Sequence, residues 1–199
     1  MEDTYKTISK TSEGLFKDKG SKFISYAFPV ESEDEIRNIV LTIKKEHHSA
    51  RHHCYAWRLG HEKLVFRAND DGEPSSTAGK PILGQIQSYD LTNILIVVVR
   101  YFGGTLLGVS GLINAYRNAA QDAILQAEII EKLVEKQLLI EFDYGVMNEV
   151  MKLFKDEKLP QNEPKFDLRC QINTQIRLSE LDRIEEGLKK IEGLKVSYL

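Results

Sequence analysis

The chain has 199 residues and a formal net charge of -3, with 42% hydrophobic and 29% charged residues. This length favours one or two domains, and the acidic balance does not indicate a strongly basic nucleic-acid binder, although it leaves a local basic patch open. The longest apolar run, Ile94 to Val99, is far shorter than the roughly 20 residues of a membrane span.

The first 45 residues predict three strands and a helix. Tyr5 to Ile8 forms a candidate first strand, and Asp18 to Gly20 has the composition of a hairpin turn. Lys22 to Val30 alternates with the period of two that is typical of a strand. Ser32 to Glu35 is a capping box that predicts a helix start. The apolar residues after it share one helical face: Ile36, Ile39, Val40 and Ile43.

Two further strands and a polar loop are expected next. His53 to Leu59 and Lys63 to Arg67 have strand composition and are separated by a short turn. Ala68 to Gly79 is polar, rich in turn formers and without apolar periodicity. A loop of this length inside a compact domain is usually functional or mobile. Pro81 then suits the first turn of a short helix.

The segment from Asn93 to Ala120 organises the chain. Its β-branched run, Ile94 to Val99, fits a strand buried on both faces. Glycines follow at 103, 104, 108 and 111, and a helical apolar stripe begins at Leu112. A strand, a glycine-rich turn and a helix can place backbone N–H groups at a helix start, where an anion is stabilised.

A charged segment from Glu128 to Gln137 predicts the boundary between two domains. The later elements are expected as strands at 138–142, 165–168, 170–178 and 194–198, with helices at 146–155 and between Ser179 and Gly193. This βαββαβ order is typical of a ferredoxin-like fold. The sequence therefore predicts an α+β protein with domains at 1–130 and 137–199.

The glycine turn lacks both common nucleotide-binding motifs. Gly103-x4-Gly108 is followed by Val109 and Ser110, so the lysine of a P-loop is missing, and no G-x-G-x-x-G is present. A looser anion site remains, built from backbone N–H groups near 104–111 with Arg100 close by. The alternative is a turn whose glycines only allow tight packing of strand and helix.

Three carboxylates lie within four residues, at Asp70, Asp71 and Glu73. Oxygen ligands of this kind suit Mg²⁺, but the spacing does not match an EF-hand loop. The alternative interpretation is Asp-Gly turn chemistry followed by a stiff Glu-Pro corner.

Histidines, a cysteine and lysines offer weaker signals. His48 and His52 have H-x3-H spacing, and Cys54 with His52 and Asp70 has the residue types of a nucleophilic triad. Histidines with satisfied hydrogen bonds at a strand start are the simpler explanation. Lysines and phenylalanines alternate around the hairpin, as expected either for phosphate contacts or for ordinary surface and core positions: Phe16, Lys17, Lys19, Lys22 and Phe23.

Several segments in this order resemble the Impact/YigZ family. The matching segments are 19–23, 50–56, 70–74, 77–81, 99–104, 107–108, 111–112 and 115–116. The resemblance implies an N-terminal domain similar to the second domain of ribosomal protein S5 and a C-terminal domain similar to the last domain of elongation factor G. Eukaryotic relatives regulate translation by interfering with activation of the kinase that phosphorylates initiation factor 2. They carry an extra N-terminal domain, and the layout of this chain looks like the bacterial branch.

Two positions depart from the family pattern. Ser76 and Ser110 stand where the family usually has glycine. If either position requires a positive φ, serine is disfavoured there.

The first hypothesis is a cytoplasmic, non-enzymatic, translation-associated protein that binds RNA, the ribosome or a protein partner. Two widely separated cysteines and an N-terminus without an apolar signal core favour the cytoplasm, and no membrane partner, cofactor, catalytic residue or metal ligand is expected. The candidate binding residues come from the hairpin, the acidic loop and the glycine turn: Ser21, Lys22, His52, Asp70, Asp71, Glu73, Thr77, Arg100, Tyr101, Gly103, Gly104 and Gly108.

Two alternatives remain open at this stage. One is a metal-dependent hydrolase or phosphotransferase that uses Asp70, Asp71 or Glu73. The other is an interaction module that works through the C-terminal sheet.

Overall fold

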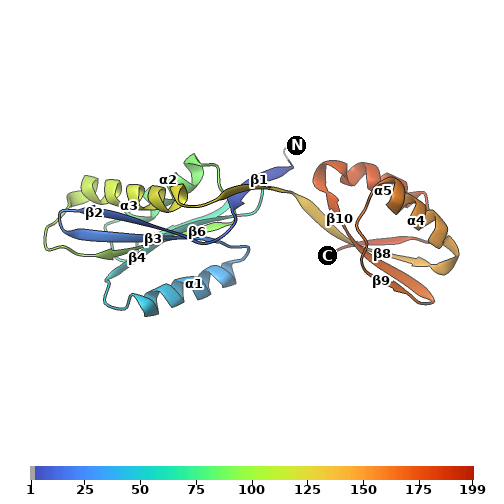
Figure 1. Ribbon diagram of the computed structural model, residues 1–199, viewed down its shortest axis with the longest axis horizontal. Coiled ribbons are helices and arrows are strands. Elements are labelled where there is room, and N and C mark those ends of the chain that lie inside the picture. Colours follow the sequence, from blue (N-terminus) through green and yellow to red (C-terminus); the bar gives the residue numbers. More distant parts are fainter. Residues whose placement is uncertain (1–2) are drawn as a thin grey trace. The chain divides into compact units, whose positions relative to one another are not determined.

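The computed structural model describes residues 3–199 and divides them into two mixed α and β units (Figure 1). The N-terminal unit comprises residues 5–132. The C-terminal unit comprises residues 133–199 together with Asp3 and Thr4. Each unit has its own buried apolar cluster.

A five-stranded antiparallel sheet forms the centre of the N-terminal unit. In spatial order its strands are β2 (Ser12–Asp18), β3 (Ser21–Pro29), β6 (Ile94–Tyr101), β4 (His52–Leu59) and β5 (Val65–Asn69). The predicted hairpin turn is confirmed, because β2 and β3 pair directly on either side of Lys19 and Gly20. On the central strand β6, Arg100 lies opposite Phe23 of β3 and His52 of β4.

Helices cover both faces of this sheet. Figure 1 shows α2 (Gly79–Ser88) and α3 (Gly108–Leu125) on one face and α1 (Glu33–Glu46) on the other. Alternate residues of β6 enter the two resulting cores: Ile94, Ile96 and Val98 on the α2 and α3 side, and Leu95, Val97 and Val99 on the α1 side. A strand that is buried on both faces must be apolar at every position. The predicted burial of the run from Ile94 to Val99 is therefore confirmed.

The start of α1 follows the predicted capping motif with one change. The Ser32 hydroxyl accepts a hydrogen bond from the Glu35 backbone N–H at 3.2 Å. The Glu35 carboxylate, however, accepts from the backbone N–H of Glu31 and not from that of Ser32. Both interactions satisfy donors at the entrance of the helix.

A two-stranded sheet joins the two ends of the N-terminal unit. It pairs β1 (Thr4–Ile8) with β7 (Ile129–Leu133). The charged segment from Glu128 to Gln137, where the domain boundary was predicted, contains β7, which was not predicted as a strand. Four of the five residues of β7 are exposed, so its sequence shows little alternation of apolar and polar residues. Its partner strand, β1, lies more than 120 residues earlier in the chain.

The C-terminal unit has the predicted β-α-β-β-α-β order. Its elements along the chain are β8 (Glu135–Asp143), α4 (Met147–Asp156), β9 (Asn162–Phe166), β10 (Arg169–Arg177), α5 (Leu181–Lys189) and β11 (Lys195–Tyr198). The antiparallel sheet has the spatial order β11-β8-β10-β9. Helix and sheet share one core that contains Phe142, Phe154 and Leu188.

The last helix is shorter than the expected span between Ser179 and Gly193. Ser179 lies in a 3₁₀ turn, Leu178–Glu180, and α5 begins after it with Glu180 at the N-cap position. Helix α5 also ends at Lys189, before Gly193. In the described part of the chain, no helix combines the length and the apolar character needed to cross a membrane.

Candidate functional site

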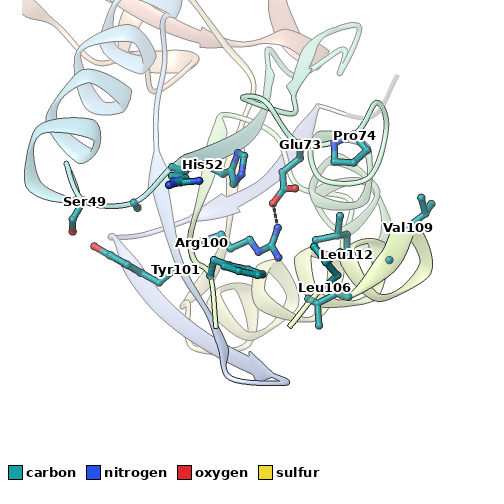
Figure 2. A pocket seen from close by; sticks show the side chains of 14 residues that line it. Ser49, His52, Glu73, Pro74, Arg100, Tyr101, Leu106, Val109 and Leu112 are labelled. Atoms are coloured by element: carbon teal, nitrogen blue, oxygen red, sulfur yellow. Dashed lines mark hydrogen bonds and ion pairs between the residues drawn. The ribbon is translucent and has the colours of Figure 1, made fainter. Parts of the chain in front are cut away.

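A pocket of about 860 Å³ opens where β6 ends, close to the start of α3 (Figure 2). Four segments of the N-terminal unit form its walls: the chain entering β4, the acidic loop after β5, the end of β6 and the turn into α3. The lining residues are Ser49, Ala50, Arg51, His52, Glu73, Pro74, Arg100, Tyr101, Phe102, Leu106, Leu107, Gly108, Val109 and Leu112. Most of these residues are apolar, as is usual for ligand pockets.

A buried ion pair lies in the pocket wall. Arg100 Nη1 donates to Glu73 Oε1 at 2.7 Å, and the two side chains are 8% and 3% exposed (Figure 2). The same Glu73 oxygen accepts a 2.7 Å hydrogen bond from the Tyr116 hydroxyl. The Arg100 guanidinium carbon lies 5.6 Å from the ring centroids of both Phe23 and Phe102, within cation–π range. The charge of Glu73 is thus compensated by a positioned partner, which a buried carboxylate requires.

Arg100 nevertheless keeps an unused donor. Its Nε atom is buried and makes no hydrogen bond within residues 3–199. A buried polar atom without a partner is uncommon in native proteins and calls for an explanation at that position.

Asp70 holds the acidic loop against the start of α2. Its carboxylate accepts hydrogen bonds from the backbone N–H groups of Ser76 (2.8 Å), Ala78 (3.0 Å) and Gly79 (2.8 Å). These donors surround the first turn of α2, which has no capping side chain of its own. A carboxylate at this position accepts hydrogen bonds from free N–H groups, and its negative charge interacts favourably with the positive end of the helix dipole.

Asp71 points to different partners. Its carboxylate accepts from Lys44 Nζ at 2.7 Å and from the His53 backbone N–H at 2.8 Å. Partial burial would raise the pKa of Asp71, but the hydrogen bonds from Lys44 and His53 outweigh burial and lower this pKa below its ordinary value. Asp71 is therefore charged and held in place at neutral pH.

The three carboxylates of the acidic loop do not converge on one point. Asp70 faces backbone N–H groups, Asp71 faces Lys44, and Glu73 faces Arg100. Among residues 3–199, no group of three or more His, Cys, Asp or Glu side chains is placed to hold a metal ion. A metal-dependent reaction would need at least two of these oxygens near one ion, and their geometry does not support it.

The cysteine of the hypothetical nucleophilic triad is enclosed. Cys54 is fully buried, and its Sγ lies 3.0 Å from the Asp70 carbonyl oxygen and 3.3 Å from the Tyr116 hydroxyl. Burial raises the pKa of the Cys54 thiol far above its ordinary value. A reactive cysteine needs an accessible thiolate, so the interpretation of Cys54 as a nucleophile is wrong.

The glycine turn combines close packing with an open helix start. A Cβ on Gly103 would lie 1.9 Å from the backbone carbon of Gly20, and the Gly103 N–H donates to the Ser21 hydroxyl at 3.1 Å. Gly104 and Gly108 have φ values of +89° and +72°, which favour glycine. Gly108 is the first residue of α3, and no side chain caps this helix.

The two departures from the family pattern have different structural consequences. Ser76 has a φ of +65°, so its position does require the left-handed conformation that glycine adopts easily. Ser110 lies inside α3, where φ is negative and serine is acceptable.

The candidate residues fall into three groups. The first group lines the pocket and consists of His52, Glu73, Arg100, Tyr101 and Gly108. The second group shapes the loops around it through hydrogen bonds or close packing and consists of Ser21, Asp70, Asp71, Thr77 and Gly103. Lys22 and Gly104 are exposed and belong to neither group.

The apolar wall of the pocket was not predicted. It includes Phe102, Leu106 and Val109, whose residues are 56%, 82% and 60% exposed. Exposed apolar residues that gather at one place often mark a binding surface. The signal in the sequence was a leucine pair between glycines, in a turn where polar residues are usual.

Comparisons with known proteins show the family of the chain. Residues 19–124 match the family profile of the Impact N-terminal domain. An IMPACT family member of Haemophilus influenzae is 42% identical over 68% of this chain and 66% of its own length. YvyE of Bacillus subtilis is 28% identical over 98% of this chain and 90% of its own length, and YigZ of Escherichia coli is 37% identical over 63% of each chain.

A solved structure shares the whole architecture. The crystal structure of a hypothetical protein superimposes with a TM-score of 0.75, covering 100% of this chain and 98% of the other at 24% sequence identity. At this identity the likeness concerns the fold alone. The family match covers more than half of the chain and includes the pocket residues from His52 to Leu112, and the chain therefore belongs to the Impact family.

Proposed function

We propose that this chain is a cytoplasmic, non-enzymatic protein associated with translation regulation, which binds RNA, the ribosome or a protein partner through the surface around the pocket. The observation that carries the proposal is the pocket itself: an exposed apolar wall beside a buried charged pair, at the open start of α3. Such a combination of apolar area and a few placed polar groups is typical of binding sites. The link to translation comes from the family resemblance.

The same proposal includes the fold of each unit. Residues 1–130 would form a domain similar to the second domain of ribosomal protein S5, and residues 137–199 a ferredoxin-like domain similar to the last domain of elongation factor G. The antiparallel order β11-β8-β10-β9 supports the second assignment, because it is the strand order that a β-α-β-β-α-β chain adopts in that fold.

The geometry favours binding over catalysis. Each carboxylate of the acidic loop stabilises a neighbouring segment, and Cys54 is enclosed. The exposed groups Arg51, Phe102 and Leu106 around the pocket are suited to contact. His52 also lines the pocket, and its ring is held by the acidic loop, with Nδ1 3.0 Å from the Asp71 carbonyl oxygen.

Two exposed arginines of the N-terminal unit provide a matched test. Arg51 lines the pocket, whereas Arg117 lies on α3 outside the lining. We expect Arg51→Glu to remove ribosomes, RNA or a protein partner from the material that the tagged wild-type protein retains from lysate. Arg117→Glu should retain them, because it makes the same charge change elsewhere.

Treatment of the lysate with RNase separates the partner classes. Loss of the bound material after RNase identifies RNA, and its persistence identifies protein. The proposal fails if the wild type retains no translation component, or if Arg51→Glu and Arg117→Glu give identical profiles. Arg100 is a poor choice for this experiment, because its side chain is buried in an ion pair and its removal would disturb the fold.

A further inference from the structure

Two lysines lie directly opposite each other near the end of the β2–β3 hairpin. Lys17 of β2 pairs in register with Lys22 of β3, and both residues are exposed. Their strand neighbours Phe16 and Phe23 pack in the core on the α2 and α3 side, so both lysines project from the other face of the sheet. Like charges that face each other across two strands destabilise a sheet. The lysine pair therefore lowers the stability of the hairpin.

A third lysine occupies the hairpin turn at a further local cost. Lys19 and Gly20 form its two-residue loop, and their φ values are +44° and +81°. Positive φ at both residues is the pattern of a type I′ turn, in which Asn, Asp or Gly is preferred at the first position. The hairpin tip, defined as Lys17, Lys19 and Lys22, thus keeps positive charge where the local structure disfavours it. Departures of this kind from local rules are expected at functional sites.

No lysine of the hairpin tip forms an ion pair within residues 3–199. The lysines and arginines of the N-terminal unit that do form ion pairs are Arg37, Lys44, Arg58, Lys63 and Arg100. Asp18 follows Lys17, but the alternation of side chains along β2 directs it to the opposite face. Glu13 shares the face of the lysines, but it pairs with Tyr26 further along the hairpin. An anionic ligand would offset the repulsion that the fold leaves at the tip.

The basic surface continues from the hairpin tip toward the pocket. Lys22 pairs with Tyr101, the last residue of β6. Arg51, which is exposed, directly precedes β4 and lies at this same end of the sheet, because His52 pairs with the residue before Tyr101. With adjacent strands about 5 Å apart, the row from Lys17 on β2 to Arg51 at β4 spans about 15 Å. Cations along such a row can contact successive phosphates of one nucleic-acid strand.

Phe102 adds an exposed aromatic residue next to the hairpin tip. It directly follows β6 and is 56% exposed. Its neighbour Gly103 packs on the turn, where a Cβ would lie 1.9 Å from the backbone carbon of Gly20, and donates to the Ser21 hydroxyl. Phe102 is therefore adjacent to the basic row. Cations that follow a phosphate backbone and an exposed ring for the bases are the combination that binds single-stranded nucleic acids.

From these observations we infer that the hairpin tip binds the phosphate backbone of single-stranded RNA, with Arg51 continuing the contact toward the pocket and Phe102 stacking on a base. The exposed aromatic residue favours this ligand over an acidic protein segment, for which the cations alone would suffice. This inference rests on the proposed function and its association with translation, and it specifies the ligand and the residues that contact it.

Lys22→Glu separates binding from folding in one variant. It replaces the repulsion between Lys17 and Lys22 by an attraction across the strands, so we expect a higher thermal midpoint than that of the wild type. It also removes a phosphate contact. Fluorescence anisotropy with an oligouridine of about 12 nucleotides should therefore show binding about tenfold weaker or more, with a shallower dependence on salt.

Lys10→Glu is the matched control. Lys10 is exposed and lies before β2, at the opposite end of this strand from Lys17. Lys10→Glu makes the same change of net charge as Lys22→Glu, and we expect it to bind the oligouridine as the wild type does. Phe102→Ala tests the aromatic contact. Because base stacking involves no charge, its affinity should fall about tenfold while the salt dependence stays that of the wild type.

Four results overturn the inference. The first is that the wild type does not bind the oligouridine, and the second is that Lys22→Glu binds it as well as Lys10→Glu does. The third is that Lys22→Glu lowers the thermal midpoint together with the affinity, since a damaged fold then explains the loss. The fourth is that polyglutamate displaces the RNA as effectively as unlabelled oligouridine does, which identifies an acidic protein segment as the ligand.

The lysate experiment keeps this inference separate from the proposed function. If Lys22→Glu leaves RNA binding unchanged while Arg51→Glu still removes ribosomes, RNA or a protein partner from the retained material, the hairpin assignment fails and the proposed function stands. If Arg51→Glu also gives the same profile as Arg117→Glu, both fail.

Discussion

The ion pair between Arg100 and Glu73 determines how much unfolding free energy is lost when either residue is replaced. In Arg100→Met, Glu73 stays buried with the Tyr116 hydroxyl as its remaining partner. We expect this variant to lose about 3–5 kcal/mol of unfolding free energy, because an uncompensated buried charge is costly. The double variant Arg100→Met with Glu73→Gln also removes the buried negative charge. We expect its unfolding free energy to be higher than that of Arg100→Met by about 1 kcal/mol or more.

Urea unfolding followed by the fluorescence of Trp57 measures this difference. Trp57 is the single tryptophan of the chain and is buried in the same unit. The single variant Glu73→Gln completes the cycle. Strictly additive losses in the double variant would show that the two side chains do not stabilise each other.

The limit of sequence reasoning at this scale is visible in the acidic loop. The motif correctly drew attention to Asp70, Asp71 and Glu73, but a sequence does not show whether a carboxylate faces solvent, a lysine or a row of backbone N–H groups. The partners of Asp71 and Glu73 lie 27 residues away, at Lys44 and Arg100. Only the folded chain brings these partners together, so the structural role of each carboxylate could not be predicted.

Elements with strong local signals were predictable. The apolar run of β6 and the capping motif of α1 each contain the physical reason for their structure. Elements that depend on partners far away in the sequence could not be predicted. Strand β7 pairs with β1, which lies near the other end of the chain, and Arg177 just before α5 pairs with Asp3.

The same substitution at two positions should have opposite effects on stability. Ser76→Gly relieves a positive φ in the acidic loop and should stabilise the protein by about 0.5–1 kcal/mol. Ser110→Gly introduces glycine into α3 and should destabilise it by up to about 1 kcal/mol. Thermal unfolding of both variants measures the sign directly, and a loss of stability in Ser76→Gly would show that the serine side chain contributes more than the strain costs.

At the scale of the whole molecule, the chain consists of two units with separate cores. The core of the N-terminal unit contains residues on both faces of β6, whereas the core of the C-terminal unit contains residues of β8, β10, α4 and α5. The two-unit organisation followed from composition and element order. The membership of Asp3 in the C-terminal unit was not predicted, because its partners, the Val134 backbone N–H and the Arg177 side chain, lie far along the chain.

Separate cores predict separate unfolding transitions. Ile172 is fully buried on β10, and Ile172→Ala should destabilise the C-terminal unit by about 2–5 kcal/mol. Because Trp57 belongs to the other unit, its fluorescence transition should stay in place while part of the circular dichroism transition moves to lower temperature. Ile96→Ala is the matched control in the N-terminal core and should move the Trp57 transition. If Ile172→Ala shifts the Trp57 transition as far as Ile96→Ala does, the two units unfold in one cooperative transition and the prediction is wrong.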